Sequence, residues 1–135
     1  MAIPRDQTAK AYYFAAVQRR EDARQLLLAR RTTGAVYLAG YCVECALKAL
    51  IVVETPARKR AGVRDELNTH SYATLRHLYQ TRCGGMLTRQ LARDLTILRT
   101  WSSEMRYDGG NIRMADAEAL LAAVDRIWAW IDARL

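Results

Sequence analysis

The sequence has few of the residues that make turns, with two prolines and seven glycines among 135 residues. This scarcity argues against a many-stranded β protein, whose turns need both residue types. Disorder is excluded because 51% of the residues are hydrophobic. A chain of this length builds one domain around one core. We therefore expect residues 1–135 to form a single all-α domain.

Cysteine is also scarce, and three cysteines do not make a disulfide framework. Residues 1–5 lack the apolar segment of a signal peptide, which predicts a reduced, cytoplasmic protein. Cys42 and Cys45 have the spacing of half a zinc or redox site, but no second pair follows and their neighbours are apolar. We interpret both as packing residues.

Several kinds of catalytic site are missing as well. His70 and His77 do not share the four-residue spacing of two ligands on one helix. The sequence contains neither a phosphate-cradling glycine loop nor a serine nucleophile motif. We therefore expect no metal and no cofactor.

Acidic residues are the minority, with 14 Asp and Glu against 21 Lys and Arg, for a net charge of +7. The excess lies in the middle of the chain, because residues 1–55 carry +3, residues 56–113 carry +6 and residues 114–135 carry −2. Eighteen of the basic residues are arginine, whose guanidinium pairs with phosphate through two hydrogen bonds. This charge weakly favours a phosphate-bearing partner.

Apolar residues recur at helical spacing along most of the chain. The expected helices span residues 6–31, 33–54, 71–81, 86–107 and 116–135. A basic loop over residues 55–69 starts next to Pro56, and Asp116 is the expected N-cap of the last helix. Five helices predict an up-and-down helical bundle.

Two of these helices carry more apolar surface than one core contact needs. The first has Phe14, Val17 and Leu28 on the side opposite its core stripe, which predicts a second covering surface and hence a homodimer. The second, residues 33–54, is long enough to span a membrane. Glu44 and Lys48 near its middle would be costly in lipid, so we expect a buried central helix and no membrane contact.

The same central helix supplies a candidate binding site. Its polar stripe contains Tyr41, Glu44 and Lys48, and this stripe must face either a cavity or solvent. Arg106 and Tyr107 end the fourth helix, where a guanidinium and a ring could meet a phosphate and a base. The alternative is structural, with Glu44 paired to Lys48 or Arg106 inside the bundle.

Three segments in this order resemble the HEPN domains, which are small helical bundles. They are residues 34–50, residues 69–75, and Glu104-Met-Arg-Tyr107 followed by a turn and a helix containing Ile127-Trp-Ala-Trp-Ile131. The resemblance covers essentially the whole chain. It implies a dimer with a cleft at its interface, RNA or a nucleotide as ligand, and a nucleotidyltransferase partner in a toxin–antitoxin or defence pair.

Many HEPN proteins are metal-independent ribonucleases with Arg, four to six residues and then His before the last helix. This chain has Arg106 there, but Asn111, Ile112 and Arg113 stand where the histidine is required. The resemblance therefore implies that the usual general base is lost.

One other match to this spacing exists, Arg64 with His70, and it lies before the short helix. Three hypotheses stay open: a protein that binds RNA or a nucleotide without cleaving it, a ribonuclease toxin that uses Arg64 and His70, and a structural subunit that only docks a nucleotidyltransferase.

Overall fold

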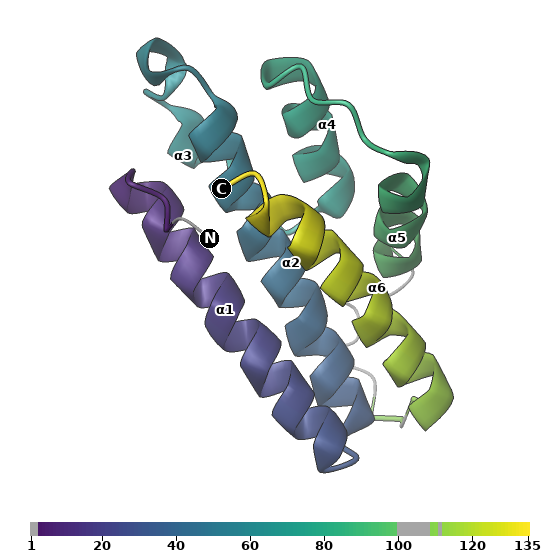
Figure 1. The fold of residues 1–135 in the computed structure, drawn as a ribbon. Coiled ribbons are helices and arrows are strands. Elements are labelled where there is room, and N and C mark those ends of the chain that lie inside the picture. The colour runs from purple at the N-terminus through teal and green to yellow at the C-terminus, as the bar shows by residue number, and fades with distance from the viewer. Residues whose placement is uncertain (1–2, 100–108, 111) are drawn as a thin grey trace.

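The computed structural model describes residues 3–99, 109–110 and 112–135. Within these residues the protein is all-α, as the sequence predicts, and contains no strand. The elements are α1 (Gln7–Leu28), α2 (Thr32–Glu54), the 3-10 helix η1 (Ala57–Lys59), α3 (Val63–Glu66), α4 (Tyr72–Arg82), α5 (Arg89–Arg99) and α6 (Met114–Asp132). Figure 1 shows α1, α2 and α6 side by side, with α4 and α5 packed on the other side of α2 and α6.

The two longest helices, α1 and α2, form a tight pair. Asp6 caps α1 by accepting a hydrogen bond from the Ala9 N–H at 2.9 Å. The helix ends at Leu28 rather than at residue 31, because Arg30 adopts a left-handed backbone with φ of 59°. Ala16 and Ala23 are buried against α2, and their small side chains let the two helices approach closely.

The central position of α2 confirms the expected buried helix. It packs against α1, α4 and α6, and its side chains are buried continuously from Cys42 to Val52. Among the described residues it is the one helix long and apolar enough to cross a membrane. Most of that span is covered by the protein itself, as expected for a core helix, so the helix gives no indication of a membrane protein.

The structure between α2 and α6 differs from the sequence prediction at two places. The expected loop over residues 55–69 contains η1 and α3, which are too short to produce a hydrophobic period. Helix α5 begins at Arg89 rather than at residue 86, because the Thr88 side chain accepts a hydrogen bond from the Leu91 N–H at 3.1 Å. Residues 100–107 of the expected helix lie outside the described part of the chain.

The predicted Asp116 N-cap is wrong. Helix α6 begins at Met114, after Arg113, and Asp116 lies in its first turn. There Asp116 accepts a hydrogen bond from Arg113 Nε at 3.0 Å, and its negative charge is favourable near a helix N-terminus. The same residue therefore stabilises the helix start without capping it.

The α5–α6 contact contains an ion pair between a buried carboxylate and a half-exposed arginine, which the sequence does not reveal. Asp94 is fully buried, and its carboxylate accepts hydrogen bonds from Arg126 Nε at 3.1 Å and Nη2 at 2.9 Å. Gln90 donates a third hydrogen bond to the same carboxylate at 3.1 Å. The Asp94 carboxylate is thus held from both helices.

Candidate functional site

A group of charged side chains surrounds Glu44 in the middle of α2. Glu44 is buried, and its Oε2 atom accepts a hydrogen bond from Lys48 Nζ at 3.2 Å. Its Oε1 atom lies 3.0 Å from Nδ1 of His70. The predicted pairing of Glu44 with Lys48 is therefore present, and His70 is a second partner.

His70 reaches Glu44 from the segment that leads into α4. The next residue, Ser71, caps α4 by accepting a hydrogen bond from the Thr74 N–H at 3.2 Å. This cap sets where the helix begins and so where the imidazole lies. The side chain of His70 is 59% exposed, whereas the Glu44 side chain beneath it is 6% exposed. The pair therefore extends from the solvent-exposed surface into the interior of the bundle.

Aromatic rings line the rest of this group. The Lys48 ammonium lies 5.7 Å from the centre of the Tyr12 ring of α1, within the range of a cation–π contact. Tyr41 is half-buried one turn before Cys45, and its pKa is raised first by Cys45, then by burial and by the negative charge of Glu44. Lys48 is thus enclosed by a carboxylate and a ring.

Tyr72, the first residue of α4, packs its side chain against α2 at Gly40. A Cβ atom at Gly40 would lie 2.6 Å from the Tyr72 hydroxyl oxygen, so only glycine permits this approach. Burial, and then the charge of Glu44, raises the pKa of Tyr72 well above its usual value. The hydroxyl is therefore protonated across the physiological pH range.

The hydrogen bonds around Glu44 determine what His70 can do. An ionised carboxylate only accepts hydrogen bonds, so the Nδ1 atom of His70 must donate to it. This fixes the ring tautomer and leaves Nε2 to accept from, or exchange a proton with, a group outside the protein. The arrangement suits either a ligand contact or proton transfer.

Two thiols, those of Cys42 and Cys45, are also buried on α2. Burial raises the pKa of Cys42 to about 12 and that of Cys45 to about 11. Both thiols are free and protonated near neutral pH, where a thiol is a poor nucleophile. Within the described part of the chain, no group of three His, Cys, Asp or Glu side chains could hold a metal ion.

The residues predicted for the site are only partly brought together. Glu44 and Lys48 are in contact, and Tyr41 lies one turn away on the same helix. Arg106 and Tyr107 lie outside the described residues. Two arginines near the start of α5, Arg89 and Arg93, are exposed.

Arg64, the predicted partner of His70, lies at a different place. It is exposed on α3 and lines a pocket with Asp6 and Arg60, near the start of α1. No hydrogen bond or ion pair joins it to His70 among the described residues. The spacing between Arg64 and His70 does not predict the contact of His70 with Glu44, which lies 26 positions away in the sequence.

The fold and this charged group define an all-α bundle whose central helix carries a carboxylate reached from the surface by a histidine. The chain belongs to the HEPN family, since a model of the HEPN domain matches residues 9–134, nearly the whole chain. This membership points to a ribonuclease or nucleotide-related function. Comparison with curated proteins and with solved structures gave no match.

Proposed function

We propose that this HEPN protein is a homodimer that binds RNA or a nucleotide without cleaving it, and that it acts with a nucleotidyltransferase in a toxin–antitoxin or defence module. One observation carries the binding proposal: His70 is held at Nδ1 by the buried Glu44 and faces solvent with the rest of its ring. A fixed imidazole loses little freedom when it contacts a ligand. The net charge of +7 favours a phosphate-bearing ligand.

The absence of cleavage is inferred from the sequence before the last helix. The family's nuclease motif needs a histidine separated from its arginine by four to six residues, and Asn111, Ile112 and Arg113 occupy those positions after Arg106. Without a general base there, the 2′-hydroxyl of RNA is not activated by the usual pair.

Binding and cleavage are tested together with a fluorescently labelled single-stranded RNA in EDTA. We expect RNA binding without cleavage, and we expect His70→Ala to weaken binding about tenfold through loss of one hydrogen bond to a charged group. Gln18→Ala, at an exposed position of α1, is the matched control and should leave the affinity unchanged. Fluorescence anisotropy measures the affinity, and gel electrophoresis measures cleavage. No RNA or nucleotide binding by the wild-type protein would refute the proposed function.

The second candidate, a metal-independent ribonuclease, is favoured by the Glu44–His70 pair, because a carboxylate that orients an imidazole is a common general-base arrangement. Cleavage in EDTA that His70→Ala abolishes in a folded protein would favour it, and Arg64→Ala would test the second predicted residue. Binding that appears only after a nucleotidyltransferase is added would favour the docking subunit instead.

Dimerisation is supported by the exposed stripe on α1. Phe14, Val17 and Leu28 are all exposed, and apolar side chains in a row on one helix are typical of a contact surface. We expect light scattering at about 50 μM protein to give a dimer and Val17→Asp to give a folded monomer. Ala119→Asp, at an exposed position of another helix, α6, is the matched control. A wild-type monomer at this concentration would contradict the homodimer.

A further inference from the structure

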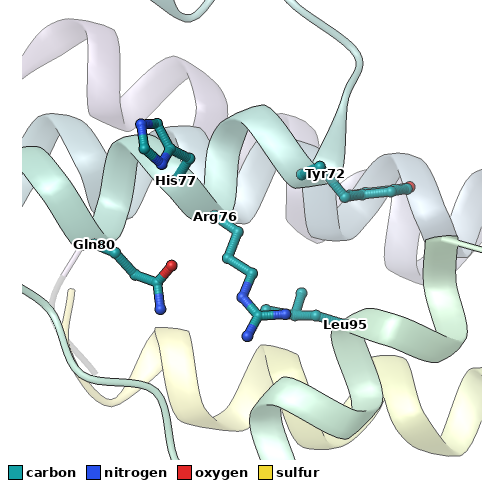
Figure 2. Close-up of a pocket in the computed structure, with 6 residues that line it drawn as sticks. Tyr72, Arg76, His77, Gln80 and Leu95 are labelled. Carbon is teal, nitrogen blue, oxygen red and sulfur yellow. The ribbon is translucent and has the colours of Figure 1, made fainter.

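A second polar pocket lies between α4 and α5. It has a volume of about 270 Å³ and is lined by Tyr72, Ala73, Arg76, His77, Gln80 and Leu95. Figure 2 shows Arg76 projecting from α4 toward Leu95 of α5, while Gln80, one helical turn further on, extends from the same side of α4. The pocket therefore has a cation and an amide on one wall and an apolar side chain on the other.

The guanidinium of Arg76 is unusual among the half-buried arginines. Arg20, Arg60 and Arg82 have side chains that are 29%, 34% and 26% exposed, and each pairs with a carboxylate, those of Asp125, Asp6 and Glu66 respectively. Arg76 is half-buried too, but within the described part of the chain it has no hydrogen bond or ion pair. A partly desolvated cation without a partner is costly, so the pocket favours an anion.

Among the described residues, α4 and α5 supply no carboxylate that could pair with Arg76. Residues 71–99 contain five arginines and one acidic residue, Asp94. That carboxylate is fully buried and already accepts hydrogen bonds from Arg126 and Gln90. Neither helix therefore has an uncommitted carboxylate to neutralise Arg76.

We propose that this pocket binds a phosphate group of the protein's ligand. Arg76 donates two parallel hydrogen bonds to the phosphate oxygens, Gln80 donates a third from its amide, and Leu95 and the Tyr72 ring cover the adjoining ester. A volume of about 270 Å³ lies just below the usual range of small-molecule sites and has room for a phosphate group and the adjoining ester. The site deepens the proposed function, on which it rests for the choice of a phosphate ester.

The phosphate could be the terminal group of a nucleotide or a diester within RNA. Calorimetric titrations with inorganic phosphate, with AMP and with a single-stranded RNA that lacks terminal phosphates distinguish these sources. Binding of phosphate and AMP alone would assign a terminal phosphate, whereas binding of the unphosphorylated RNA would assign a diester.

The deciding variant is Arg76→Gln, with Arg24→Gln as the control that removes the same charge from an exposed position of α1. We expect Arg76→Gln to lower the affinity for whichever of these ligands binds by about tenfold. For RNA, the slope of log affinity against log salt should fall by about one. Arg24→Gln should change the affinity less than about twofold, and circular dichroism checks that both variants fold.

The outcomes separate this proposal from the proposed function. Wild-type binding that Arg76→Gln leaves unchanged would overturn the pocket assignment and leave the proposed function standing. Phosphate binding that Arg76→Gln abolishes, in a protein that binds neither RNA nor AMP, would keep the pocket and refute the proposed function. If Arg76→Gln and Arg24→Gln lower the affinity equally, the loss comes from net charge alone. That result would also overturn the pocket assignment.

Discussion

Arg126→Met is expected to lower the free energy of unfolding by about 2 kcal/mol, because it takes the half-exposed charged partner away from the fully buried Asp94 carboxylate. The substitution removes both hydrogen bonds from Arg126 to Asp94 and leaves a fully buried carboxylate with only the Gln90 amide as partner. Methionine keeps the aliphatic packing of the arginine stem, so the loss measures the ion pair. Urea unfolding followed by circular dichroism gives the free energy.

Two further variants make the measurement specific. Arg113→Met breaks a pair of the same type, with Asp116, at an exposed site, and exposed pairs contribute at most about 1 kcal/mol. Asp94→Leu combined with Arg126→Met removes both charges, and we expect it to recover most of the stability. An Arg126→Met variant that loses no more than Arg113→Met would show that Asp94 is not isolated from water.

The sequence predicts helices well here because their apolar faces repeat within a few residues. In α5, the buried Leu91, Leu95 and Leu98 fall at helical spacing and reveal the core face. Asp94 lies directly before Leu95 and is equally buried, yet nothing in its neighbourhood distinguishes it from a solvated residue. Its burial depends on Arg126, which is 32 positions away. Such a pair becomes visible only once the two helices are packed.

The candidate site likewise contains one contact that the sequence predicts and one that it does not. The Glu44–Lys48 pair is one helical turn long, so its spacing alone predicts it. The Glu44–His70 contact depends on how the segment between α2 and α4 is folded, including η1 and α3, whose three and four residues are too few for a periodic pattern. Contacts between residues one helical turn apart can thus be predicted from the sequence, whereas contacts between segments distant in the sequence cannot.

Lys48→Met is expected to lower the free energy of unfolding by about 3 kcal/mol, because it leaves Glu44 buried with a single, partly exposed partner. The side chains of Lys48 and Glu44 are only 9% and 6% exposed, so water cannot replace the lost hydrogen bond cheaply. A second variant, Glu44→Leu with Lys48→Met, removes both charges and should be more stable than Lys48→Met alone. Urea unfolding again gives the free energies.

His70 distinguishes a structural cluster from a binding site, because it shares Glu44 with Lys48 but is mostly exposed. We expect His70→Ala to cost less than about 1.5 kcal/mol, the usual contribution of one hydrogen bond, and still to weaken RNA affinity as stated above. Lys48→Met would then mainly lower the stability and His70→Ala mainly the RNA affinity, although both side chains touch the Glu44 carboxylate. If His70→Ala instead destabilises the protein as much as Lys48→Met and binds RNA normally once folded, Glu44 and both of its partners are structural, and the ligand contacts lie elsewhere on the bundle.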